Sequence, residues 1–259
     1  MNNNKKELIK YLESQNWRAC ITGSIYLDYF ENQDIDVFAY DERSMVKILY
    51  TLLNNKMFQV LEPLEKWKID EFLEKGNNSL KKIGVFSIKF KYNLLLDVNI
   101  IVKRNADNIF TILSSFDFDL ISKGYCMETH QFLDLSNNST KNIQWNKWNK
   151  NYIYLDIWKI NRLLRQLDRC IKYHKRGYNT DNVILKYIEI IDFSLNYQNI
   201  FNSEKFDERI IEYKKSAISL KGICEEWLKT HEISDEEYER LKNITKKDLV
   251  DVVSRKAHL

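Results

Sequence analysis

One short segment of the chain carries the residues best suited to chemistry on phosphate groups. An apolar run is followed by Gly23 and Ser24, and the acids Asp34 and Asp36 come ten residues later. Glycine lets the backbone turn sharply and come close to a ligand, and a helix that starts after the turn offers N–H groups to an anion. Side chains alternate along a strand, so both acids would share one face, where two close carboxylates need a cation between them. Mg²⁺ fits, because it takes hard oxygen ligands from one or two carboxylates and leaves the remaining positions to phosphates and water.

Asp97 is the expected third carboxylate. It is the only acid in the apolar stretch 94–102, where burying a charge without a partner would be costly. In-line phosphoryl transfer with two metal ions needs a ligand that also reaches the ion at the attacking hydroxyl. The candidate catalytic and metal-binding residues are therefore Asp34, Asp36 and Asp97. The expected cofactor is a pair of Mg²⁺ ions, with Mn²⁺ as the alternative.

Each part of this pattern also has an ordinary structural explanation. A Gly-Ser pair before a helix is a common capping turn, and three polar residues before Asp34 are typical of a loop. The ordered combination of turn, paired acids and isolated acid is what favours catalysis. Asp117 and Asp119 form a competing pair, but no Gly-Ser turn precedes them. We expect them to face solvent or basic neighbours from a strand whose Phe116 and Phe118 pack inward.

Together, the Gly-Ser turn, the paired acids between apolar residues and the later isolated acid resemble the polymerase β type nucleotidyltransferase superfamily. The resemblance covers roughly the first half of the chain. In that family the turn holds the triphosphate, the paired acids hold metal, and the third acid completes the site and helps to activate the attacking hydroxyl. The resemblance implies these roles for Gly23 and Ser24, for Asp34 and Asp36, and for Asp97, respectively.

The activity that follows is the transfer of a nucleoside monophosphate from an NTP or dNTP to a hydroxyl, with pyrophosphate as the leaving group. The leading interpretation is template-independent synthesis or tailing of nucleic acid, including the short signalling oligonucleotides of antiphage defence. One alternative is a nucleotidyltransferase toxin that modifies a tRNA end or a protein. Another is a catalytically silent module that binds nucleotide or RNA. The expected partners are thus the nucleotide, a nucleic-acid acceptor and a protein.

The pattern of apolar residues changes near residue 138, from short segments typical of β-strands to the periodicity of helices. The expected strands are 19–22, 34–39, 57–61, 82–92, 94–102, 116–123 and 131–135, and the expected helices are 25–30, 42–54, 105–114, 154–175, 181–196, 204–229 and 234–254. We predict an α/β (α+β) nucleotidyltransferase-like catalytic lobe with a small mixed sheet over residues 1–138. A mostly helical lobe over residues 139–259 would bind nucleotide or acceptor.

The stretch 158–173 predicts an amphipathic helix with leucines on one side and basic residues on another. The basic residues recur every three or four positions: Arg162, Arg165, Arg169 and Lys172. The stretch is similar to the helix that follows the catalytic domain in several template-independent nucleotidyltransferases. Arg162, Arg165 and Lys172 are therefore candidate nucleotide-binding residues that would grip a triphosphate or an oligonucleotide backbone. A solvated helix whose arginines pair with surface acids explains the pattern equally well.

Gly177 would close this helix, and Tyr173 or Tyr178 could stack on a base.

Composition sets the outer limits. The chain has 259 residues, 44% hydrophobic and 30% charged, which suits a globular protein with a substantial core. No apolar run approaches the ~20 residues that span a bilayer, and the first residues do not resemble a signal peptide, so we expect no membrane insertion and a cytoplasmic location. The four cysteines are scattered without metal-type spacing and indicate packing roles. A net charge of +3 is too small to predict nucleic-acid binding by itself.

Overall fold

The computed structural model describes residues 3–27, 34–75, 84–136, 142–144, 157–201, 208–234 and 236–243. The chain forms two compact units that divide near residue 138. None of the described helices is long and apolar enough to cross a membrane.

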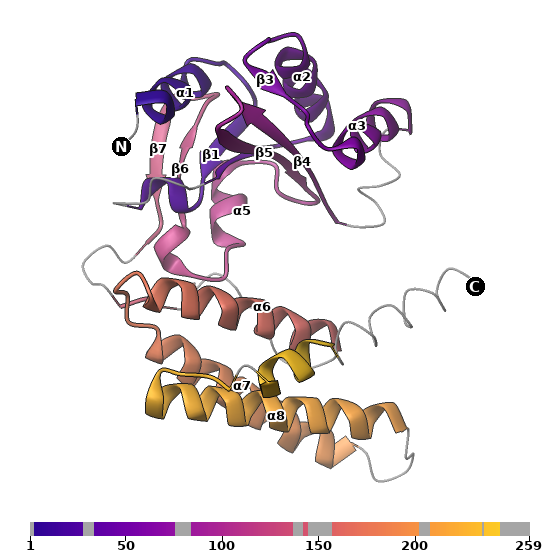
Figure 1. Ribbon diagram of the computed structural model, residues 1–259, viewed down its shortest axis with the longest axis vertical. Helices are drawn as coiled ribbons and strands as arrows, with labels where there is room; N and C mark the ends of the chain where they lie inside the picture. Colours follow the sequence, from indigo (N-terminus) through magenta and orange to yellow (C-terminus); the bar gives the residue numbers. More distant parts are fainter. Residues whose placement is uncertain are drawn as a thin grey trace. The chain divides into compact units, whose positions relative to one another are not determined.

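The first unit is built on a seven-stranded mixed sheet with the order β3-β4-β5-β2-β1-β6-β7 (Figure 1). The strands are β1 (Ala19–Thr22), β2 (Ile35–Ala39), β3 (Phe58–Gln59), β4 (Val85–Tyr92), β5 (Leu96–Lys103), β6 (Lys123–Cys126) and β7 (Gln131–Asp134). β2 and β5 run parallel, and the other neighbouring pairs are antiparallel. The predicted mixed α/β class is confirmed.

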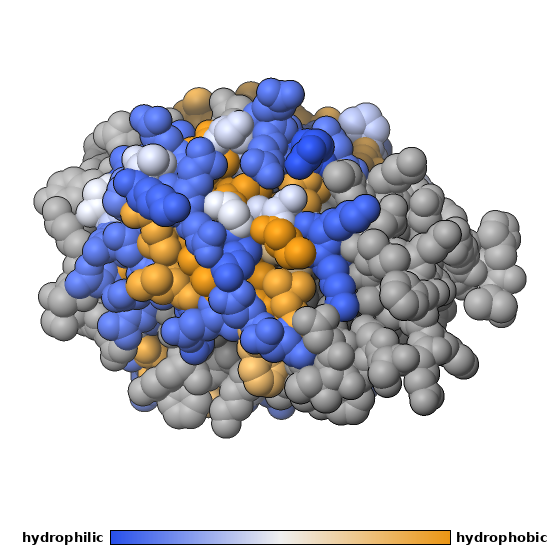
Figure 2. Space-filling view, turned by 90° about the horizontal axis from the view of Figure 1, so that it is seen from below, coloured by the Kyte–Doolittle hydropathy of each residue, from blue (hydrophilic) through white to orange (hydrophobic). Residues whose placement is uncertain are grey.

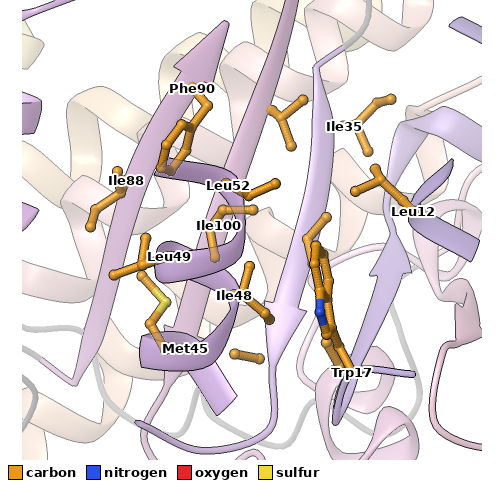
Figure 3. Close-up of a cluster of buried hydrophobic side chains, with 14 of the residues drawn as sticks. Leu12, Trp17, Ile35, Met45, Ile48, Leu49, Leu52, Ile88, Phe90 and Ile100 are labelled. Carbon is orange, nitrogen blue, oxygen red and sulfur yellow. The ribbon is translucent and has the colours of Figure 1, made fainter. Parts of the chain in front are cut away.

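One face of this sheet packs against three helices, α1 (Asn3–Glu13), α2 (Glu42–Leu53) and α3 (Pro63–Lys75) (Figure 1). In α2 the buried residues follow helical spacing, so they form one apolar stripe: Met45, Ile48, Leu49 and Leu52. Figure 3 shows this stripe beside the inward side chains of β4 and β5. Asp41 caps the helix, because its carboxylate accepts a hydrogen bond from the Ser44 N–H. The large core on this face holds the strands in register.

The opposite face is covered at one end by α5 (Ile109–Ser114), which packs against a smaller cluster that includes Cys20, Phe38 and Cys126. Alternation along β2 sends Phe38 to this face, whereas Ile35 and Val37 are fully buried in the larger core. Asp36 must then lie on the same face as Phe38.

The segment 116–123 is not the strand that its pattern predicts. Phe118 precedes a single turn of 3₁₀-helix, η2 (Asp119–Ile121), and β6 starts only at Lys123. Asp119 and Ile121 are both buried, as is Asp117. Of the two expected surroundings for these acids, exposure to solvent is wrong because the segment is a buried turn, and basic neighbours stay a prediction.

The second unit consists of helices. They are α6 (Ile157–His174), α7 (Asp181–Phe201), α8 (Glu208–Thr230) and a shorter helix over 236–243. The Tyr238 hydroxyl donates to Asp168 Oδ1 at 2.7 Å and lies 3.1 Å from the Leu164 carbonyl oxygen, so it ties the short helix to α6. Hydrophilic and hydrophobic residues are interspersed on the molecular face of Figure 2. The expected helices of the C-terminal half are present over the described residues.

Candidate functional site

Gly23 forms the turn that follows β1. Its φ of 90° and ψ of −153° lie in a region that residues with a side chain rarely adopt. A Cβ placed on Gly23 would lie 3.2 Å from Asp36 Oδ2, which is tighter than nine in ten real Cβ contacts. The backbone conformation favours glycine, and a side chain here would also push the Asp36 carboxylate by a few tenths of an ångström. The turn is in close approach to the Asp36 carboxylate.

The turn continues into one turn of 3₁₀-helix, η1 (Ser24–Tyr26). The predicted helix over 25–30 is shorter than expected in its described part, and residues 28–33 lie outside the described residues. A single 3₁₀ turn has too few aligned peptides to form a strong dipole. Phosphate binding at this turn would therefore depend on individual N–H groups of Gly23 and Ser24.

Asp34 and Asp36 lie close together, joined by a residue that the sequence interpretation did not single out. Asn99 Nδ2 donates to Asp36 Oδ1 at 2.9 Å and lies 3.5 Å from Asp34 Oδ2. The reason is the parallel register, which sets Asn99 directly beside Asp36. The amide hydrogens offset part of the repulsion between the two carboxylates. Asn99 lies two residues beyond Asp97, and side chains two positions apart on a strand share one face. That spacing was the sequence signal that could have identified Asn99 as a site residue.

Asp97 lies on the same face as Asn99, because exposure alternates along β5. Its carboxylate contacts lysines on β4: Lys91 Nζ is 2.6 Å from Oδ1, and Lys89 Nζ is 3.8 Å from Oδ2. The side chain of Asp97 is 22% exposed. Among the described residues, Asp34, Asp36 and Asp97 do not form a group of three that could hold a metal ion. The contacts of Asp97 are with the two lysines of β4 instead.

Across four strands these residues form a row on one face of the sheet. Thr22 pairs with Asp36, Asp36 with Asn99, and Asn99 with Lys89. Hydroxyl, carboxylate, amide and ammonium groups thus follow one another from β1 to β4. We call these four residues the polar row.

Thr22, at the β1 end of the polar row, is fully buried. Its Oγ1 has no hydrogen-bond partner in the part of the chain that the structure describes. A buried hydroxyl without a partner is costly, and such a group beside a carboxylate has unused capacity to bind a water molecule or a ligand oxygen.

No three His, Cys, Asp or Glu side chains within the described ranges lie close enough together to hold a metal ion. The oxygen ligands that do lie together are the carboxylates of Asp34 and Asp36. A half-turn of the Asn99 side chain would add its amide oxygen. Two carboxylates and an amide oxygen suit a hard divalent cation, and Mg²⁺ usually takes only one or two carboxylates from the protein. The residues present therefore fit such an ion at Asp34 and Asp36.

The cluster between the sheet and α5 holds two groups that resist ionisation. Burial raises the pKa of the Cys20 thiol, and burial also raises the pKa of the Tyr40 hydroxyl. The Tyr40 hydroxyl donates to Cys126 Sγ at 3.1 Å. Burial opposes ionisation of Cys126, but hydrogen bonds from Thr129 and Tyr40 prevail and lower its pKa. All four cysteines are buried, in agreement with their predicted packing roles.

The basic helix lies in the second unit as α6. Its predicted core stripe is confirmed, because Leu163, Leu164 and Leu167 are buried. The basic residues lie on another side: Arg162 is half-buried, and Arg165, Arg169 and Lys172 are exposed. A nucleotide-binding role for Arg162, Arg165 and Lys172 stays a prediction.

Gly177 has a φ of +82° and ends this helix as predicted. Tyr173 is only 5% exposed, and its ring centroid is 6.1 Å from that of Tyr178, edge to face. The packing of Tyr173 inside the helical unit argues against it as a platform for base stacking.

Comparisons with protein-family models, with curated proteins and with solved structures found no match to this chain.

Proposed function

We propose that the protein is a metal-dependent nucleotidyltransferase that moves a nucleoside monophosphate from an NTP or dNTP to a hydroxyl acceptor. Template-independent synthesis or tailing of nucleic acid is the form that we favour, with antiphage defence as its setting. The observation that supports this most directly is the close approach of the Gly23 turn to Asp36, since a Cβ on Gly23 would lie only 3.2 Å from Oδ2. A glycine turn beside paired carboxylates is an arrangement that suits this chemistry.

The roles follow from position. Asp34 and Asp36 would hold Mg²⁺, and the Gly23–Ser24 turn would orient the β- and γ-phosphates through its N–H groups. Bound Mg²⁺ would supply charge neutralisation at the transferred phosphate. Asn99 keeps the two carboxylates close together before any ion binds, because its amide contacts both of them.

Asp97 would accept the proton of the attacking hydroxyl. Lys91 Nζ lies 2.6 Å from its Oδ1, and Lys89 Nζ lies 3.8 Å from its Oδ2. Oδ1 is buried and accepts no hydrogen bond among the described residues, so its contact with Lys91 is electrostatic.

The test is incubation of the purified protein with each labelled NTP and dNTP and Mg²⁺, alone and with RNA, followed by a denaturing gel. A ladder indicates polymerisation, one added band indicates tailing, and label on protein indicates a protein target. We expect Asp36→Asn to abolish transfer and to leave folding largely intact. The matched control is Asp70→Asn, because Asp70 is exposed on α3, the helix that covers the other face of the sheet.

Full activity in Asp36→Asn would contradict the assignment. One observation favours a second candidate, a silent module that binds nucleotide: Lys91 Nζ, at 2.6 Å, already neutralises Asp97. That candidate predicts binding of labelled NTP without transfer to any acceptor.

A further inference from the structure

The outward face of β4 carries two lysines beside the proposed site. Phe86, Ile88 and Phe90 point into the core, so alternation leaves Lys89 and Lys91 on the other face. The antiparallel register places Lys89 opposite Asn99 and Lys91 opposite Asp97. Both ammonium groups are therefore on the face of the polar row, beyond β5 as seen from Asp36.

Two lysines here share one carboxylate. Lys91 is close to Asp97, at 2.6 Å, whereas Lys89 is only loosely paired, at 3.8 Å. Their side chains are 31% and 43% exposed. The two ammonium groups share the Asp97 carboxylate, so an anionic ligand at the loosely paired Lys89 would supply a second counter-charge.

The backbone under Lys89 is fixed by a second acid. Glu65 of α3 is buried, and its Oε2 accepts a hydrogen bond from the Lys89 N–H at 2.8 Å. Its other oxygen, Oε1, is 2.6 Å from Lys68 Nζ. β3 is too short to pair with β4 at Lys89, since its register reaches only Lys91 and Tyr92. The Glu65 carboxylate therefore fixes the backbone of β4 at Lys89 in place of a neighbouring strand. The Lys89 side chain itself is exposed on the other face of the sheet.

We infer that Lys89 and Lys91 bind neighbouring phosphates of a single-stranded nucleic-acid acceptor, which lies along the outward face of β4 with its hydroxyl end at Asp97. This inference rests on the proposed function. Alternate residues of a strand are about 6.6–6.8 Å apart, a separation comparable to that of successive phosphates in an extended single strand. The same charge repels an amine-rich acceptor.

The geometry has a consequence for Asp97. An acceptor phosphate competes with Asp97 for Lys91 and so releases the carboxylate for the attacking hydroxyl. Acceptor binding would then complete the site.

The experiment measures binding of a fluorescently labelled single-stranded RNA oligonucleotide by anisotropy, without nucleotide or metal, over a range of salt concentrations. The variants are Lys89→Ala, Lys91→Gln and the double variant. The control is Lys47→Ala, because Lys47 is exposed on α2, across the sheet from the lysine pair. We expect the double variant to bind at least about 10-fold more weakly and to reduce the slope of log K against log salt by about 1.4, since each phosphate contact to a single strand contributes about 0.7. Lys47→Ala should match the wild type.

Equal binding by the double variant and the wild type would overturn the inference, as would a wild type that binds no RNA. Lys89→Ala is the variant least able to disturb folding, because Lys89 is only loosely paired with Asp97, at 3.8 Å. Weaker RNA binding by this variant would therefore reflect the lost ammonium group and not a misfolded protein. The inference and the proposed function fail separately. Lysine-dependent RNA binding with no transfer from any NTP or dNTP would refute the function alone, and transfer with lysine-independent RNA binding would refute the inference alone.

Discussion

Replacement of Gly23 by alanine tests the close approach on which the proposed site depends. The observed φ of 90° and ψ of −153° are nearly restricted to glycine, and a side chain in such a region costs about 1–3 kcal/mol. Alanine also lowers the conformational entropy of the unfolded chain, which stabilises the folded protein by about 0.4–1 kcal/mol. We therefore expect the free energy of unfolding to fall by about 1–2 kcal/mol.

The added methyl has a second effect, on the site itself. It would lie 3.2 Å from Asp36 Oδ2, so the carboxylate must shift by a few tenths of an ångström. The 2.9 Å hydrogen bond from Asn99 to Oδ1 would be disturbed as well. We expect Mg²⁺-dependent binding of a fluorescent NTP to weaken by about 10-fold or more, as for other changes that displace a metal-binding carboxylate.

Gly84→Ala is the matched control. Gly84 also has a positive φ, +76°, in the same unit, but nothing lies within 4 Å of its Cβ position. Urea unfolding followed by circular dichroism should show a loss of stability for both variants, while only Gly23→Ala loses nucleotide binding. Wild-type nucleotide affinity in a folded Gly23→Ala protein would refute the reasoning.

Two further changes probe the polar row and the cluster under α5. Asn99→Ala removes the amide that joins Asp34 and Asp36, so transfer rates at a fixed Mg²⁺ concentration should fall about 10–100-fold; an unchanged dependence on Mg²⁺ would argue against the role of Asn99. Burial raises the pKa of Cys20, so its thiol stays neutral in the folded protein at pH values where the unfolded chain ionises, above about 8.5. The free energy of unfolding is therefore unaffected by this thiol below the pKa of the unfolded chain. Above that pKa it falls as pH rises, by about 1.4 kcal/mol per pH unit for each such group. Cys20→Ala should therefore flatten the loss of unfolding free energy between about pH 9 and 10.5, measured with urea at each pH, and an equally steep loss would contradict this.

Local patterns in the sequence predict the strands that carry the candidate site well. β1 and β2 appear where the apolar runs place them, and Ile35 and Val37 are fully buried behind Asp36 as alternation requires. The stripes of α6 follow from helical spacing in the same way. Such features depend on the periodicity of neighbouring residues, and one sequence contains all of that information.

Features set by distant pairing were harder to predict. The contact of Asp97 with Lys91 requires the register of β4 on β5, and no local signal specifies it. The sequence interpretation also missed α3, whose Leu64 and Trp67 are exposed and blur its apolar stripe. In the segment around Asp119, burial by distant parts of the fold outweighs the strand-like alternation of its aromatic residues.

The order of groups across the sheet bears on the direction of the proposed reaction. The Gly23 turn follows β1, the carboxylates of Asp34 and Asp36 belong to the β2 segment, and the lysines lie on β4. In an in-line displacement the leaving group and the attacking oxygen lie on opposite sides of the transferred phosphorus. A triphosphate at the turn and an acceptor at Lys89 and Lys91 would approach the carboxylates from opposite sides, as that geometry demands. If the donor and acceptor positions were exchanged, the pyrophosphate would leave toward the lysines, and Lys89→Ala would then weaken nucleotide binding rather than RNA binding.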